Sequence, residues 1–316
     1  MNTTPKKLRT CIQTNNAPNN SEIDNSKLTA VFNPKLLWPA YKNITIGFIG
    51  DGENIDLIDD NPINDEDPLH KDIMILLRQN PRKITVKEAI KEIVRKRIEP
   101  IVNLKFTFVE NPFEALVKIS FDATKGSNSH IGYNGDNFPH QMNYAWFNVA
   151  VVLHEFGHLI GLHHEHQNPY ENPILWDKEA VYKMTNELWK WTKEEADLFI
   201  LNNIDKESIN GSTFDPLSVM QYQYPPEWTT NKIRSVLNGR FSKKDVLWIC
   251  KKYPKQNEDP TVTAENFYQR VYGESLQSSI DPKKSDSKII WIVIGIVFGL
   301  IIIWGVIALI IFKNRK

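Results

Sequence analysis

Apolar positions in the first half of the chain follow both strand and helix periods. Every second residue of 44–48 is apolar, which predicts a strand. Further strands are predicted over 105–110, 116–121 and 141–147. Between them, residues 86–98 have helical spacing, with Thr85 and Glu88 as a capping box and Pro100 as the end of the helix. The acidic segment 51–67, which contains no Lys or Arg, predicts a solvated loop; a calcium site is the alternative, although the EF-hand spacing is absent.

The second half of the globular region is predicted to be mainly helical. Residues 148–160 are strongly apolar and predict a buried helix. Further helices are predicted over 177–184 and 192–203, the latter with Thr192 and Glu195 as a capping box. Strands and one helix are therefore followed mostly by helices. This order predicts an α+β domain around a mixed, twisted sheet.

A continuous apolar run lies close to the C-terminus. Residues 289–312 contain no charged, Asn, Gln, Ser, Thr or Pro side chain. As a helix the run is about 36 Å long, enough for a hydrocarbon core of about 30 Å. It predicts a transmembrane helix; a buried core helix is the alternative. The predicted organisation is a disordered polar arm (1–34), a catalytic domain (35–254), a polar stalk (255–288), the transmembrane helix (289–312) and a basic tail (313–316).

Two signals disagree about which side of the membrane holds the domain. Residues 1–20 have no apolar stretch typical of a secretory signal, which favours insertion by the C-terminal anchor with the domain on the cytosolic side. The basic tail 313–316 favours the opposite orientation under the positive-inside rule. We expect a single-pass protein with a cytosolic domain. Whether the membrane is viral or belongs to a host is left open.

Charge and cysteine content exclude two classes of protein. Lys and Arg number 38, and so do Asp and Glu, so the formal net charge is zero. This balance argues against a nucleic-acid binder that depends on positive charge. Cys11 and Cys250 are the only cysteines, which excludes a scaffold stabilised by several disulfides.

The sequence from 154 to 164 has the spacing of a catalytic metal site. His154 and His158 are four residues apart, so on a helix they share one face and can bind one metal ion. Gly161 allows a sharp turn, which would return His164 as a third ligand. Three nitrogen ligands leave one position for water, which is typical of catalytic zinc. Glu155 can then act as general base on that water.

Peptide-bond hydrolysis with one zinc ion per chain is the reaction that best fits this pattern. The neighbouring His163 is expected to form a wall of the site rather than to bind the metal. The alternative is a set of histidines on an ordinary buried helix.

The histidine motif, Glu165 after it, and Ser-Val-Met-Gln-Tyr at 218–222 resemble the astacin branch of the metzincin endopeptidases, in its microbial form. The resemblance covers roughly 36–254. It implies that Met220 lies in a turn beneath the metal. It also implies that Tyr222 is a movable ligand that stabilises the oxyanion. Packing of Tyr222 beside Tyr224 is the alternative interpretation.

The resemblance also implies a peptide-binding edge strand. Ser129, His130, Ile131 and Tyr133 are expected to line the rim of the cleft, where a protein or peptide substrate pairs as an added strand. Gln221 stands where many astacins have histidine. Residues 48–51 match an astacin propeptide motif whose aspartate blocks zinc, but they lie where the first strand of the domain is expected. A cysteine switch at Cys11 is the other latency device considered, and its surrounding residues do not match.

The leading hypothesis is a membrane-anchored zinc endopeptidase whose partners are its substrate and a bilayer, with no nucleic acid. The alternative is a catalytically inactive metzincin fold that binds peptides or serves as a structural membrane protein. Within the enzyme class, a matrixin is disfavoured because Glu165 replaces the usual small residue. The sequence does not indicate an oligomeric state.

Overall fold

The computed structural model describes residues 34–58, 63–64, 66–79, 84–208, 213–235 and 237–274. Most of the predicted N-terminal arm, the transmembrane segment 289–312 and the basic tail lie outside these residues. The chain divides into two compact units, Met1–Phe267 and Tyr268–Lys316. The sheet and the candidate site described below belong to the first.

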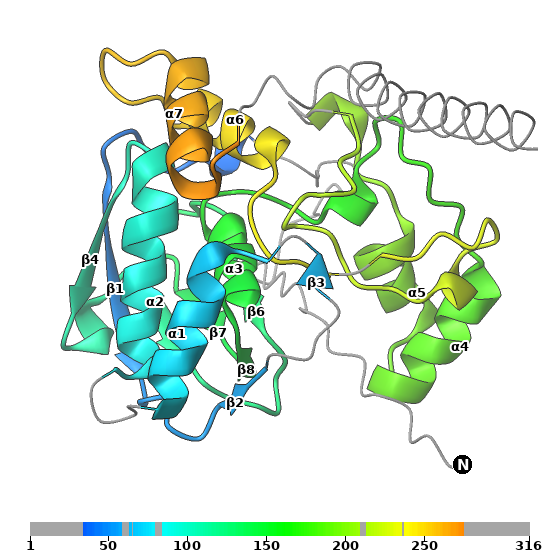
Figure 1. Ribbon diagram of the computed structural model, residues 1–316. Helices are drawn as coiled ribbons and strands as arrows, with labels where there is room; N and C mark the ends of the chain where they lie inside the picture. The colour runs from blue at the N-terminus through cyan, green and yellow to red at the C-terminus, as the bar shows by residue number, and fades with distance from the viewer. Residues whose placement is uncertain are drawn as a thin grey trace, which may run out of the picture. The chain divides into compact units, whose positions relative to one another are not determined.

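The first unit is built around a five-stranded mixed sheet with the order β4-β1-β5-β7-β6 (Figure 1). Its strands are β1 (Asn43–Ile49), β4 (Lys105–Val109), β5 (Val117–Ser120), β6 (Asn128–Ser129) and β7 (His140–Asn143). The first four strands in this order are parallel, and β6 pairs antiparallel with β7 at the edge. The predicted mixed sheet and α+β class are confirmed.

The predicted strand over 141–147 is two strands in different sheets. Tyr144 ends β7 by donating its backbone N–H to the carbonyl of Ser120, at 2.9 Å. The chain then forms β8 (Trp146–Phe147), which pairs in parallel with β2 (Asp56–Leu57). A second small pair joins β3 (Ile63–Asn64) to β9 (Leu237–Asn238). The sequence did not reveal this break because no Gly or Pro separates the two strands.

Three helices belong to the sheet region: α1 (Pro68–Gln79), α2 (Val86–Ile93) and α3 (Val149–Leu159). The sequence interpretation missed α1, although Leu69, Ile73 and Leu77 recur at helical spacing and are buried. For α2 the predicted cap is present, since the Thr85 side chain accepts from the backbone N–H of Glu88. The α-helix ends at Ile93, and a π-helical turn, Val94–Ile98, and a 3-10 turn, Glu99–Ile101, continue it. Pro100 therefore lies inside the last turn and does not end the helical segment.

One end of the acidic segment 51–67 is not solvated. Asp67 is 1% exposed, and its two carboxylate oxygens accept hydrogen bonds from Arg97, both at 2.7 Å. Asp67 also accepts from the backbone N–H of Leu69 at the start of α1. The prediction of a solvated loop is therefore wrong for this residue, because a buried carboxylate is tolerated where it is paired and hydrogen-bonded.

Helices follow the sheet in the described residues from 178 to 272, as predicted for the second half of the globular region. They include α4 (Lys178–Trp189), α5 (Lys193–Ala196), α6 (Lys243–Lys252) and α7 (Pro260–Tyr272). Asp177 caps α4, and α5 has the predicted capping box of Thr192 and Glu195. A π-helical turn, Asp197–Leu201, continues α5.

Helix α7 lies where the sequence predicted a polar stalk. Ala264 and Phe267 are 0% and 1% exposed, so this helix buries one face. Residues 255–274 contain few apolar side chains, so the segment looked polar as a whole. These few side chains recur at helical spacing and form the buried face. No helix in the described part of the chain is long and apolar enough to cross a bilayer.

Candidate active site and metal centre

Helix α3 supplies the first part of the site. Asn148 begins the helix, and its side chain accepts from the backbone N–H of Val151 at 2.7 Å. Every residue of α3 is buried, as the apolar sequence predicted. His154 and His158 therefore lie one turn apart on a rigid, fully enclosed element, with Glu155 between them and 0% exposed.

A left-handed turn returns the chain to the helix. Gly161 has φ +100°, a conformation that favours glycine, and Leu162 donates its N–H to the carbonyl of Gly157 at 2.9 Å. This closure fits the turn expected at Gly161. His164 follows and is 1% exposed.

Three imidazoles converge at this point. One ring nitrogen from each of His154, His158 and His164 lies within 4.8 Å of the others. The Nε2 atoms of His158 and His164 are 3.2 Å apart. The ring centroids are separated by 4.7 to 5.2 Å.

The tautomers of two of these rings follow from their second nitrogens. His154 Nδ1 is 2.9 Å from the carbonyl oxygen of Val219, and His158 Nδ1 is 2.8 Å from that of Leu162. A carbonyl oxygen only accepts, so both Nδ1 atoms carry the proton and both Nε2 atoms present lone pairs. Buried lone pairs gathered in one place require a cation. The donor set therefore fits zinc, which these three histidines would hold.

Burial also keeps these side chains neutral. It lowers the pKa of His154 to about 4 and that of His158 and His164 well below the ordinary histidine value. Neutral imidazole is the form that binds a metal ion, so the ligands are available without losing a proton.

The turn that contains Met220 lies against α3. A Cβ placed on Gly157 would be 2.4 Å from Met220 Sδ, so the methionine packs on the helix between the two ligand turns. The Met220 carbonyl accepts from the backbone N–H of Glu165 at 3.0 Å. The turn thus contacts both α3 and the segment that carries His164, the position expected for Met220.

Tyr222 lies beside the third histidine. Its ring centroid is 5.3 Å from that of His164 and 4.8 Å from that of His166. The side chain is 3% exposed and belongs to an apolar cluster with Tyr224 and Trp228. The ring of Tyr222 therefore lies close enough to the histidine cluster for a role at the metal, and it is also packed among aromatic residues. Its surroundings are consistent with both interpretations of this residue.

The two remaining histidines of the motif region are buried outside the metal cluster. His166 Nε2 is 3.1 Å from the carbonyl of Phe199, and the ring stands between Tyr222 and Trp176. His163 faces a different pocket, which Glu165 and other acidic side chains also line. Burial lowers the pKa of both histidines to about 3.

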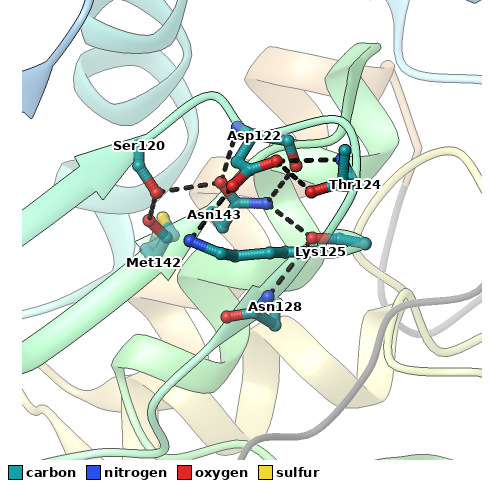
Figure 2. Close-up of polar contacts among 8 residues, drawn as sticks. Ser120, Asp122, Thr124, Lys125, Asn128, Met142 and Asn143 are labelled. Atoms are coloured by element: carbon teal, nitrogen blue, oxygen red, sulfur yellow. Dashed lines mark hydrogen bonds and ion pairs between the residues drawn. The ribbon is translucent and has the colours of Figure 1, made fainter.

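The expected cleft rim begins at the edge strand of the sheet. Ser129 lies on β6, opposite Met142 of β7. The loop before β6 is fixed by Asn143, whose side-chain oxygen accepts from the Ser120 hydroxyl and the Asp122 N–H, both at 2.8 Å (Figure 2). The Asn143 amide donates to the carbonyls of Asp122 and Gly126, at 2.9 and 2.6 Å. All four hydrogen-bonding positions of this side chain are used, which holds the edge strand in place.

The other three rim residues are oriented differently. His130 Nδ1 accepts from the N–H of Gln141, which ties it to β7, and Ile131 is buried. Tyr133 donates its backbone N–H to the carbonyl of Leu36 at 2.7 Å, and its ring lies 5.0 Å from that of Trp38. The structure therefore places Ser129 and His130 at the edge strand, and Tyr133 against the segment before β1.

Sequence reasoning missed the groups that orient the ligands. The carbonyls of Leu162 and Val219 are backbone atoms, which no side-chain pattern reveals. Gly157 was also missed, although its lack of a side chain permits the contact with Met220. A glycine inside an otherwise bulky apolar helix was the available signal.

Comparison with known proteins extends this description. The family model for the peptidase family "Astacin" matches residues 79–240. A solved structure of myroilysin is similar over 72% of this chain and 100% of its own, with 25% identity and a TM-score of 0.54. A second myroilysin structure has 24% identity, 78% and 100% coverage and a TM-score of 0.43. High choriolytic enzyme 1, a hatching-enzyme zinc protease from the medaka fish Oryzias latipes, has 14% identity, 70% and 96% coverage and a TM-score of 0.39. No curated protein sequence matches the chain.

Proposed function

Because the chain belongs to the astacin family, it is a zinc-dependent endopeptidase, and we propose that His154, His158 and His164 hold the metal while Glu155 is the general base. The observation that carries this proposal is the convergence of three buried imidazole nitrogens within 4.8 Å, on and beside the helix that bears Glu155. A zinc ion held there would lower the pKa of a water molecule towards about 7 and polarise the scissile carbonyl.

The side chains of the site then have distinct tasks. The Glu155 carboxylate takes a proton from the attacking water and delivers it to the leaving amine. Tyr222, whose ring lies beside that of His164, donates a hydrogen bond from its hydroxyl to the oxyanion that develops on the carbonyl oxygen. Burial of the whole site strengthens both interactions, because few water molecules compete.

The substrate of a peptidase is a protein or peptide, and the sheet edge suggests how it binds. Among the strands that the structure describes, β7 is the one that pairs with β6. We propose that the substrate pairs with the other edge of β6 as an added strand. Ser129 and His130 are the rim residues that this geometry supports. Asn143 fixes the loop before β6, so it determines where the substrate backbone lies.

The test compares the full-length protein with its Glu155→Ala variant. Bound zinc is measured, together with cleavage of a denatured protein mixture with and without a chelator. We expect about one zinc per chain in both proteins, and cleavage by the parent alone. Glu179→Ala, which changes an exposed residue of α4, is the matched control and should cleave normally. If both proteins hold zinc and neither cleaves, the inactive peptide-binding alternative is correct.

We further propose that residues 289–312 anchor the enzyme in a membrane with its domain on the cytosolic side. The support is the uninterrupted apolar sequence of this segment. The parent should remain in the membrane fraction after an alkaline wash, whereas a variant lacking 289–312 should be released. Protease added to sealed vesicles then reports on which side the domain lies.

A further inference from the structure

A buried carboxylate on α6 supports the turn beneath the metal centre. Asp245 is 7% exposed and lies in the first turn of its helix. Its Oδ1 accepts from the Ser218 hydroxyl at 2.7 Å, and its Oδ2 accepts from the backbone N–H of Val219 at 2.9 Å. One side chain of α6 therefore binds two consecutive residues of the segment that leads to Met220.

Val219 continues this connection to a metal ligand. Its N–H donates to Asp245, and its carbonyl accepts from His154 Nδ1 at 2.9 Å. The backbone around Val219 is thus held from one side by a carboxylate and orients an imidazole on the other. If that backbone moved, His154 would lose the acceptor that keeps its proton on Nδ1 and its lone pair directed at the metal.

Two capping boxes in the chain show that helix capping alone does not explain Asp245. In α5, Glu195 is the third residue of the helix, and its carboxylate accepts from the N–H of Thr192 on the exposed surface. In α6, Asp245 has the same position relative to Ser242, and accepts from its N–H at 3.0 Å. Of these two carboxylates, Asp245 is the one that is buried and contacts the turn near the metal.

The burial of Asp245 is unfavourable by itself. It raises the pKa of Asp245 to about 7, and the nearby carboxylate of Asp215 acts in the same direction. Asp215 is fixed in turn by the hydroxyl of Ser242, at 2.5 Å. A carboxylate that only caps a helix can do so at the surface, without the free-energy cost of burial. The hydrogen bonds to Ser218 and Val219 offset that cost and account for the buried position of Asp245.

We propose that Asp245 is a positioning residue of the metal centre, which holds Ser218 and Val219 so that the Val219 carbonyl fixes the tautomer and orientation of His154. The inference rests on the proposed function in one respect, namely that His154 binds the metal. Asp245 does not contact the substrate, so its effect is on metal binding first and on catalysis through it.

The experiment uses the full-length protein and four variants: Asp245→Ala, Asp245→Asn, Ser218→Ala and, as the matched control, Glu195→Ala. Zinc affinity is measured by competition with a chelator, and the absorption spectrum of the cobalt-substituted protein reports on ligand geometry. Thermal unfolding of the metal-free protein reports separately on the loss of a helix cap.

We expect Asp245→Ala to weaken zinc binding by about 10- to 100-fold and to alter the cobalt spectrum, as the loss of a group that orients a ligand does. Asp245→Asn should stay within a few-fold of the parent, because its amide oxygen still accepts from Val219. Glu195→Ala should bind zinc as the parent does, although it also loses a capping box.

The proposal is overturned if Asp245→Ala binds zinc as tightly as the parent, or if Glu195→Ala weakens binding equally. If Asp245→Ala does not fold, Ser218→Ala decides, because it removes one of the two hydrogen bonds and should weaken binding several-fold. A parent protein that binds no zinc would instead refute the proposed function, so the two failures are distinct.

Discussion

The two parts of the proposed metal centre are built in different ways. His154 and His158 belong to α3, a regular helix in which every residue is buried. His164 belongs to an irregular segment, positioned by the turn at Gly161 and by the hydrogen bond from Glu165 to Met220. Helical geometry alone fixes the first pair of ligands. The third depends on polar contacts between segments far apart in the sequence.

The cores around these two parts also differ. The sheet side is filled largely by aliphatic residues of α2 and β1, such as Ile44, Ile46 and Ile90. The side that carries Tyr222 is filled by large aromatic residues, including Tyr224 and Trp228. The aliphatic residues recur at a regular spacing along the sequence, whereas the aromatic and polar residues are held by individual contacts. Substitutions in the two parts should therefore fail in different ways.

The largest effect is expected from His158→Ala, which removes a ligand from the helical part. Two remaining imidazoles cannot provide the three-nitrogen set of a catalytic zinc site. We expect loss of tightly bound zinc and of the whole peptidase activity, measured by metal analysis after dialysis and by cleavage of a denatured protein. Zinc retained at the parent's affinity would show that the ligand set is wrong.

Tyr222→Phe should reduce kcat by about 10²- to 10³-fold, the range found for the loss of one oxyanion donor. The phenylalanine ring preserves the packing beside His164 and Tyr224, so zinc affinity and folding should be nearly unchanged. Steady-state kinetics on a peptide substrate separate kcat from KM. An unchanged kcat would support the packing interpretation of this residue.

Gly157→Ala tests the contact that joins the two parts. The new Cβ would stand 2.4 Å from Met220 Sδ, so the turn beneath the metal must shift. We expect a loss of about 1–3 kcal/mol in unfolding free energy, typical of overpacking, together with weaker zinc binding. In a double-mutant cycle, Met220→Ala should relieve the strain. In a solvent-exposed helix, a change from glycine to alanine is stabilising. If Gly157→Ala stabilises this protein, Met220 does not pack against Gly157.

The smallest effect is a pH dependence in the metal-free protein. Burial lowers the pKa of His140 to about 4, and it is 1% exposed. A depressed histidine pKa favours the neutral form in the fold, so its stabilisation is complete above about pH 6.5 and is lost as the pH falls towards 4. We expect this residue to contribute a slope of up to about 1.4 kcal/mol per pH unit in that window.

Denaturant unfolding between pH 4 and 7 measures this slope. His140→Gln cannot take up a proton in this window, so it should reduce the number of protons bound on unfolding by about one. An identical slope in the variant would mean that His140 is not held neutral by the fold.

Sequence patterns predicted the regular elements and failed where contacts decide. The strands β1, β4 and β5 and the helix α3 were found because period-two and apolar patterns report burial directly. Helix α1 was missed because its apolar residues are interrupted by charged ones. The break between β7 and β8 was missed because no Gly or Pro marks it in 141–147. Helix α7 was taken for a polar stalk for a related reason, since few residues make its buried face.

The candidate site divides in the same way. The sequence singled out His154, His158 and His164, which the structure brings together, because their spacing along a helix and turn is informative by itself. Asp245 lies far along the chain from α3, and it reaches the site through the backbone of Val219. Its local pattern with Ser242 indicates a helix cap, whereas its contact with Val219 is revealed by the folded arrangement alone.

The most direct test of the central claim is X-ray absorption spectroscopy at the zinc edge on the purified full-length protein. If His154, His158 and His164 hold the metal, the spectrum should show three imidazole nitrogens at about 2.0–2.1 Å and at least one further light-atom ligand. A site with fewer than three imidazoles, or one dominated by sulfur at about 2.3 Å, would contradict the account.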